Sequence, residues 1–215
     1  LIKIVWFKQP SLICSMPLFN SNSKLEILNQ VKETPFKLER QIQYLVEANL
    51  NTLLGLEFVK SEFTISGSVQ RLRIDTLAFD RKNKAFVIIE YKQDKNFSVV
   101  DQGYAYLSAM LNNKADFILE YNEARNEPLK RSSVDWSQSR IIFISQGFTS
   151  YQKEAINFKD LPIALWEIKK YSNQTISFEE IRKLNATESI KTISSKNSDV
   201  DAVSREVVVY TEQDR

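Results

Sequence analysis

Two apolar runs joined by a short polar segment constrain the fold more than any other feature of this sequence. The runs lie at residues 71–80 and 84–92, and both are rich in the branched and aromatic residues that favour strands. The polar residues between them are typical of a turn. The pattern therefore predicts two neighbouring strands paired as an antiparallel hairpin.

The register of this predicted hairpin follows from its apolar side chains. Side chains alternate between the two faces of a strand, and the apolar faces match when Phe79 lies opposite Phe86. In that register Asp75 faces Glu90, and Lys92 follows Glu90 on the same face. Directly opposed residues have Cβ atoms about 4.5–5.5 Å apart. The sequence therefore predicts two carboxylates side by side, with a lysine next to them, at the end of an apolar face.

This arrangement favours chemistry that uses a cation. Two neighbouring anions repel each other and shift each other's pKa. Mg²⁺ prefers oxygen ligands and is typically held by one or two carboxylates together with waters and substrate phosphates. Lys92 would then orient or help deprotonate an attacking water and offset negative charge on a phosphate in the transition state. The cluster is compatible with phosphodiester hydrolysis.

Composition excludes several other kinds of active site. The sequence has no histidine, one cysteine and four glycines. Without histidine there are no Ser-His-Asp triads, Cys-His pairs or histidine-ligated zinc sites, and one cysteine is too few for a thiolate cluster. The sequence also has no glycine-rich phosphate-binding motif. An enzyme built from these residues therefore depends on carboxylates, lysines and a hard metal ion.

Charge and cysteine content bear on partners and compartment. The formal net charge is only +2, so no overall basic excess points to nucleic acid. The single cysteine, Cys14, predicts a reducing, cytoplasmic location. No apolar run approaches the roughly 18 residues of a membrane span, so no membrane partner is expected.

The wider pattern predicts a mixed α/β domain with the order α-β-β-β-α-β-β-α-β over about residues 34–171. Thr34 is expected to cap the first helix, with Pro35 at its first position. Ser98 is expected to cap the second helix, with Asp101 three residues on. The expected helices are 35–49, 98–113 and 150–158, and the expected strands are 56–66, 71–80, 84–92, 115–121, 139–145 and 162–171.

Segments of different composition flank this domain. Residues 1–33 are expected to form an N-terminal extension that is partly disordered. The domain itself is assigned to residues 34–185. Residues 186–215 are polar and are interpreted as a linker or as the start of an incomplete C-terminal element.

The predicted hairpin carries residues that resemble a known signature. Asp75 followed by Glu90-Tyr91-Lys92 is similar to the signature of the PD-(D/E)XK, or restriction-endonuclease-like, nuclease superfamily, although Ile74 stands where proline is common. The α-β-β-β-α-β order resembles the superfamily's common core. More closely, the sequence resembles uncharacterised microbial proteins with a nuclease-like N-terminal domain and a small C-terminal domain of unknown function. The resemblance implies an α/β fold with a restriction-endonuclease-like mixed sheet flanked by helices.

The resemblance also implies roles for residues of the hairpin. Asp75 and Glu90 would ligate Mg²⁺, or Mn²⁺ in its place, as catalytic metal ligands. The backbone carbonyl of Tyr91 would be a further ligand, and Lys92 would act on the attacking water. The implied activity is that of a Mg²⁺-dependent endonuclease, with DNA favoured over RNA as the nucleic-acid partner. Many relatives dimerise, so a homodimer is one expectation.

Two helices are expected to add catalytic residues in the same way. Superfamily members often have an acidic residue on the first helix, and Glu39 matches it as a catalytic residue and metal ligand. Many also have a glutamine on the helix after the E-x-K strand, and Gln102 matches it, with Tyr106 one turn on.

Plainer interpretations stay open beside these. The acidic and lysine residues of the hairpin would form a surface salt-bridge cluster, Glu39 would be a solvated helix residue, and Gln102 would lie on a polar helix edge. At the level of function, the alternatives are a catalytically inactive module that binds nucleic acid or protein, and a structural domain of a larger regulatory protein.

Overall fold

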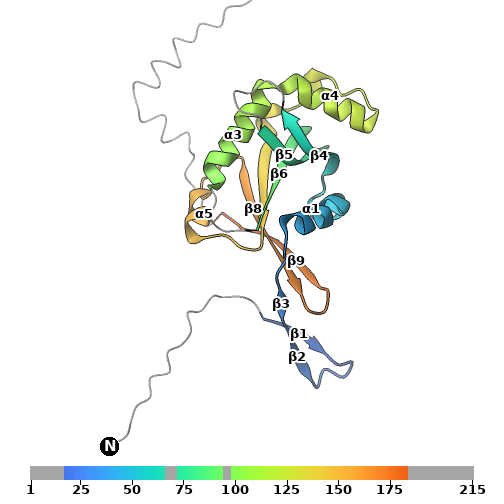
Figure 1. The fold of residues 1–215 in the computed structure, drawn as a ribbon, viewed down its shortest axis with the longest axis vertical. Helices are drawn as coiled ribbons and strands as arrows, with labels where there is room; N and C mark the ends of the chain where they lie inside the picture. The colour runs from blue at the N-terminus through green and yellow to red at the C-terminus, as the bar shows by residue number, and fades with distance from the viewer. Residues whose placement is uncertain (1–16, 66–71, 94–97, 184–215) are drawn as a thin grey trace, which may run out of the picture.

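A seven-stranded mixed sheet forms the body of the protein (Figure 1). The computed structural model describes residues 17–65, 72–93 and 98–183. The strands of the sheet are β3 (Glu33–Thr34), β4 (Glu57–Ile65), β5 (Leu72–Asp80), β6 (Ala85–Lys92), β7 (Arg140–Ser145), β8 (Ile163–Tyr171) and β9 (Ile176–Glu180). Their order is β3-β8-β7-β6-β5-β4, with β9 added beside β8. The β6–β7 and β7–β8 pairs are parallel and the other pairs are antiparallel.

Helices cover both faces of this sheet (Figure 1). On one side lie α3 (Val99–Asn112) and α4 (Lys114–Arg125), and on the other lies α1 (Glu39–Ala48). The shorter helices are α2 (Leu50–Leu54), α5 (Ser150–Ala155) and the 3-10 turns η1 (Arg131–Ser133) and η2 (Trp136–Gln138). The expected α/β fold, a mixed sheet flanked by helices, is confirmed. Among the described residues, no helix is both long enough and apolar enough to cross a membrane.

The predicted hairpin register is also confirmed. β5 and β6 pair antiparallel with Phe79 opposite Phe86. The ladder runs from the turn as far as Thr76, and its register includes no pair beyond that residue. Asp75 and Glu90 therefore lie just past the last regular pair, Thr76 with Ile89, where the backbone ladder between β5 and β6 has ended.

The face of the sheet below α3 and α4 is filled by an aromatic cluster around Phe86. Its ring stacks on Trp136 at a centroid distance of 5.5 Å. The rings of Phe79, Phe117 and Tyr121 meet the same ring at 5.2, 5.7 and 6.2 Å, edge to face. Phe86 is completely buried. This packing fixes the closed end of the hairpin.

α1 supplies the core on the opposite face. Ile42 and Val46 are completely buried and belong to one cluster with Ile89 and Tyr91 of β6. The two residues of α1 are four positions apart, so they lie on one stripe of the helix. The hairpin is thus covered on both faces, which holds its two strands in place.

α3 begins as the sequence predicts and packs unusually close to the sheet. The Ser98 hydroxyl accepts the N–H of Asp101 at 3.2 Å. A Cβ at Gly103 would lie 2.7 Å from Cδ1 of Ile163, so only glycine allows this approach without a shift of its neighbour. The approach lets the Tyr106 hydroxyl donate to a backbone carbonyl of β5 at 3.0 Å.

The strand predicted at residues 115–121 is wrong, because this segment belongs to α4. Phe117 and Tyr121 are buried, whereas Leu119 between them is 58% exposed. Burial at positions four apart is the helical spacing, whereas a strand would bury all three residues on one face. The aromatic and branched residues of this segment favoured a strand locally, and tertiary packing overrides that preference.

The predicted start of the first helix is also wrong. Thr34 lies in β3, opposite Lys170 of β8, and α1 begins at Glu39. Between them Phe36 is buried, and its N–H donates to the Gln146 side chain at 2.6 Å while its carbonyl accepts from the same side chain at 3.2 Å. These contacts keep the chain extended past Pro35, so the helix starts four residues later than Pro35 suggests.

Further strands appear where the sequence predicted none. β1 (Leu18–Ser21) and β2 (Leu28–Val31) form a separate two-stranded sheet, and β9 follows β8, which was expected to be the last strand. Residues 1–16 of the expected extension and the expected linker at 186–215 lie outside the described residues.

The aromatic cluster yields a test of the core. Replacing Phe86 by alanine removes a fully buried ring, so the free energy of unfolding should fall by about 3–5 kcal/mol. Urea denaturation followed by circular dichroism measures this loss. Tyr151→Ala is the matched control, because Tyr151 is 87% exposed and its loss should cost less than about 0.5 kcal/mol. Equal losses in the two variants would contradict the placement of Phe86.

Candidate active site

At the open end of the β5–β6 hairpin, the carboxylates of Asp75 and Glu90 are each bonded to the backbone of the opposite strand. The N–H of Asp75 donates to Oε1 of Glu90 at 3.1 Å, and the N–H of Tyr91 donates to Oδ2 of Asp75 at 3.1 Å. Each carboxylate thus accepts a backbone N–H from the opposite strand. The side chains have taken over positions that a regular ladder would fill with carbonyl oxygens.

Asp75 lies outside the regular ladders on both of its sides. On the β4 side the register passes from Ser61–Thr76 to Phe63–Ile74 and leaves out the position between. That position is Glu62, which has a left-handed backbone with φ of 53°. This conformation is uncommon for a residue other than glycine and often marks a functional position. The irregularity leaves the backbone of Asp75 available to side chains.

Lys92 lies at the edge of this carboxylate pair. Its Nζ is 3.5 Å from Oε2 of Glu90, and its side chain is 21% exposed. Glu90 itself is only 2% exposed, whereas Asp75 is half-buried. Arg73, two residues before Asp75 on β5, is exposed and pairs with Glu62 at 3.7 Å. Glu90 is therefore the enclosed member of the pair, and solvent exposure increases toward Lys92 and Arg73.

Burial makes this pair electrostatically costly. Loss of solvent, followed by repulsion from Asp75, raises the pKa of the Glu90 carboxyl to about 8. Loss of solvent also raises the pKa of Asp75 above its ordinary value. Lys92 opposes both shifts but does not cancel them. Two carboxylates in this state favour a bound proton or a bound cation between them.

The donor set fits a hard divalent cation. Each carboxylate uses one oxygen to accept a backbone N–H, which leaves Oδ1 of Asp75 and Oε2 of Glu90 as potential ligands, the latter also 3.5 Å from the Lys92 ammonium. Two carboxylates with waters are the usual protein contribution to a Mg²⁺ site. Within the part of the chain that the structure describes, no group of three or more acidic, histidine or cysteine side chains comes together. Asp75 and Glu90 are therefore a pair, not a closed cage.

The other expected site residues lie at different distances from this pair. Glu39 is the exposed first residue of α1, and no hydrogen bond or ion pair among the described residues joins it to Asp75 or Glu90. Gln102 on α3 is half-buried, and its Oε1 is buried without a hydrogen-bond partner among the described residues. Tyr106 lies close enough to the pair that burial, then Glu90 and Asp75, raise its pKa. The structure thus brings the hairpin residues and Tyr106 together and leaves Glu39 at the surface.

Tyr91 contributes through its side chain on the opposite face of the sheet. Its hydroxyl lies 3.1 Å from the hydroxyl of Thr76, which donates to Oε1 of Glu47 at 2.5 Å. The Gln43 amide completes this network by donating to the same Glu47 oxygen at 3.1 Å. The sequence analysis missed Gln43 and Glu47. The available signal was Gln43 itself, a polar residue inside the apolar stripe of α1.

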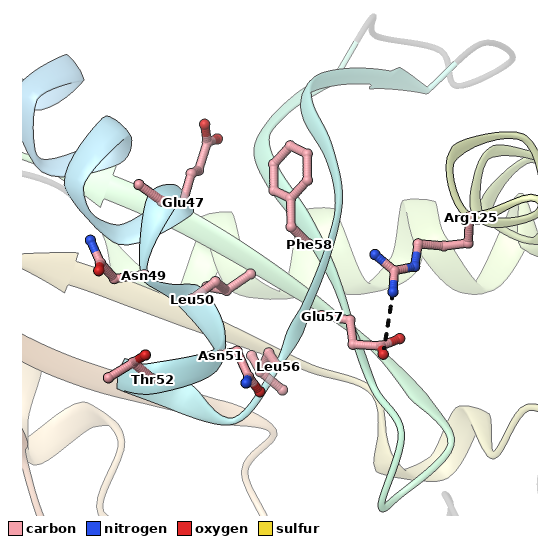
Figure 2. Close-up of a pocket in the computed structure, with 10 residues that line it drawn as sticks. Glu47, Asn49, Leu50, Asn51, Thr52, Leu56, Glu57, Phe58 and Arg125 are labelled. Carbon is pink, nitrogen blue, oxygen red and sulfur yellow. Dashed lines mark hydrogen bonds and ion pairs between the residues drawn. The ribbon is translucent and has the colours of Figure 1, made fainter.

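A pocket of about 380 Å³ opens near the end of this network (Figure 2). It lies between the α1–α2 segment and β4, and Arg125 of α4 closes one side through an ion pair with Glu57 at 3.5 Å. Neither Asp75 nor Glu90 lines it. The carboxylate pair and this pocket are therefore separate features of the molecule.

A comparison of sequences relates the chain to a protein whose name gives no activity. No family model matches the chain. An uncharacterized protein of Haemophilus influenzae is 50% identical over 192 residues, which cover 89% of this chain and 62% of that protein. The chain thus spans less than two thirds of this relative.

Solved structures resemble the chain at the level of the fold alone. A repair endonuclease from Pyrococcus abyssi has a TM-score of 0.34 and 17% identity, over 63% of this chain and 50% of that one. EndoMS in apo form has a TM-score of 0.38 and 15% identity, over 65% and 49%. A fdxN element excision controlling factor protein from Anabaena variabilis has a TM-score of 0.31 and 12% identity, over 66% and 100%.

The raised pKa of Glu90 predicts how stability depends on pH without metal. Between the ordinary glutamate value of 4.5 and about 8, the unfolded chain releases a proton that folded Glu90 retains. The free energy of unfolding of the wild type therefore falls as pH rises through that window, because folded Glu90 holds its proton more tightly than the unfolded chain does. Glu90→Gln cannot ionise, so relative to wild type it should gain about 2–4 kcal/mol between pH 5 and 9.

Urea denaturation at a series of pH values measures this difference. Glu154→Gln is the control, because Glu154 is exposed and its substitution should leave the pH dependence unchanged. A stability difference between Glu90→Gln and wild type that stays constant from pH 5 to 9 would show that Glu90 is not a strained buried acid.

Proposed function

We propose that the chain is a Mg²⁺-dependent nuclease domain that hydrolyses phosphodiester bonds in DNA through Asp75, Glu90 and Lys92. The observation that carries the proposal is a pair of carboxylates, each bonded to a backbone N–H of the opposite strand, of which Glu90 is 2% exposed and lies 3.5 Å from Lys92. A structural role alone gives no reason to bury two acids against each other, because that burial costs stability. A role in holding a cation and a phosphate accounts for it.

The proposed reaction is hydrolysis by direct attack of water. The water loses a proton as its oxygen forms a bond to phosphorus, the bond from phosphorus to the leaving deoxyribose oxygen breaks, and that oxygen takes up a proton. Asp75 and Glu90 would hold Mg²⁺, or Mn²⁺ in its place, through their second carboxylate oxygens, with the Tyr91 carbonyl as a further ligand. When bound, that ion supplies Lewis-acid stabilisation of the phosphate and lowers the pKa of water.

Lys92 has the geometry for two tasks in this scheme. Its ammonium group reaches Glu90 at the edge of the pair, and its 21% exposed side chain faces the side from which a substrate can approach. From there it would orient the attacking water and offset the charge that builds on the phosphate oxygens in the transition state. Glu39 and Gln102 stay predictions as additional catalytic residues, as do a homodimer and a cytoplasmic location.

One observation favours a second candidate function. Among the described residues, Asp75 and Glu90 form a pair without a third acidic ligand, and no hydrogen bond or ion pair joins Glu39 to them. A domain that binds nucleic acid or protein without cutting would tolerate this incomplete set. Such a module would bind with a steep dependence on salt and show no hydrolysis with any divalent ion.

The proposal predicts cleavage that depends on both metal and hairpin residues. Purified protein should cut labelled DNA with Mg²⁺ and not with EDTA. Asp75→Asn and Lys92→Met should each lower the cleavage rate by at least about 100-fold, because they remove a ligand and a transition-state cation. RNA of the same sequence should be cut more slowly than DNA.

Matched controls make this assay specific to the site. Glu154→Gln and Lys130→Met alter exposed residues that no hydrogen bond or ion pair among the described residues joins to Asp75, Glu90 or Lys92, and both variants should cut as fast as wild type. Metal-dependent cleavage that survives both Asp75→Asn and Lys92→Met would contradict the assigned site. Salt-sensitive DNA binding without cleavage in any metal would instead support the second candidate.

A further inference from the structure

Gln43 reaches the candidate site through the opposite face of the sheet. It belongs to α1, is only 8% exposed, and lies beside Ile42 in the buried stripe of that helix. Its Nε2 lies 3.1 Å from each of three acceptors, which are Oε1 of Glu47, Oγ of Ser61 and the backbone carbonyl of Asp75. A buried amide in an apolar stripe costs free energy unless its partners require it.

The contact with Asp75 is the unusual one among these three. The carbonyl of a strand residue is normally bonded by the neighbouring strand, but Asp75 lies outside the registers of both β4 and β6. Its carbonyl accepts from Gln43, and its N–H donates to Glu90. The Cα atom that carries the Asp75 carboxylate is therefore held on one side by Gln43 and on the other by Glu90.

Glu47 fixes the amide of Gln43 in turn. Its Oε1 accepts from Gln43 at 3.1 Å and from the Thr76 hydroxyl at 2.5 Å. Glu47 projects from the last turn of α1 beside β4, as Figure 2 shows. Thr76 is completely buried and follows Asp75 on β5, so the network anchors the strand at the Asp75 carbonyl and at the next side chain. The set behaves as one fully connected polar cluster, in which each member orients the next.

We propose that Gln43 is a positioning residue that sets the backbone, and through it the carboxylate, of Asp75 for metal binding. This inference rests on the proposed function of the Asp75–Glu90 pair. Gln43 touches neither carboxylate and acts through the Asp75 carbonyl. Outer partners of this kind typically change metal affinity by about 10–100-fold when they are removed.

Three variants separate positioning from simple packing of α1. Gln43→Met keeps the length of the side chain and removes the donor. Gln43→Asn keeps the amide but shortens the side chain, so that the donor no longer reaches the Asp75 carbonyl from the same backbone. Gln41→Met is the matched control, because Gln41 lies two residues away on the exposed face of the same helix. Circular dichroism and thermal unfolding establish the folded fraction of each variant before binding is measured.

Calorimetric titration with Mn²⁺ at pH 7.5 provides a readout that is independent of cleavage. Wild type and Gln41→Met should bind Mn²⁺ equally. Gln43→Met should bind it at least about 10-fold more weakly when folded. If Gln43→Met does not fold, Gln43→Asn has the same expected weakening, because its shorter amide cannot reach the Asp75 carbonyl from the same backbone.

The outcomes distinguish this inference from the function on which it rests. A wild-type protein that binds no Mn²⁺ would overturn the proposed function of the carboxylate pair. Wild-type binding that persists with equal affinity in folded Gln43→Met or Gln43→Asn would overturn the role of Gln43 and leave the proposed function standing. Loss of thermal stability with unchanged affinity would show that Gln43 serves only to pack α1.

Discussion

The pairing of Asp75 with Glu90, in which each carboxylate accepts a backbone N–H from the opposite strand, is the constraint on which the rest of this structure depends. Glu90 is buried to 2% exposure at the end of a strand whose preceding residues are all buried core. Burial of two like charges is unfavourable, and the fold lowers its cost with backbone N–H donors from Asp75 and Tyr91 and with Lys92 at the edge. The aromatic packing around Phe86 holds the closed end of the hairpin, so the strain is confined to its open end.

The two faces of the sheet share the support of that pair. On the α3 face, Tyr106 reaches the backbone of β5 because Gly103 lets the helix lie close to the sheet. On the α1 face, Gln43 bonds the carbonyl of Asp75 and is held in place by Glu47. The two helices therefore hold β5 from opposite faces, α3 at the carbonyl of Arg73 and α1 at the carbonyl of Asp75. A site built in this way sits on rigid elements and not on a loop, which suits a reaction that requires fixed ligand positions.

The sequence predicted the hairpin well because two strong local signals agreed. Alternation and the match of Phe79 with Phe86 leave one register, and that register places Asp75 beside Glu90. The segment at 115–121 was misassigned because Phe117 and Tyr121 favour strands locally, while their burial four residues apart is set by packing under α4. The role of Gln43 was not predictable from its spacing, because its partners come from β4 and β5 and its contact exists only where the β-ladder is interrupted.

The central claim is that Asp75 and Glu90 together hold a divalent cation. Anomalous diffraction from wild-type crystals soaked in Mn²⁺ tests it most directly, because the signal locates the ion without reference to activity. The account predicts a peak within about 2.0–2.6 Å of one carboxylate oxygen from each of the two residues. An anomalous map with no peak there, with both carboxylates still bonded to the N–H groups of Asp75 and Tyr91, would contradict it.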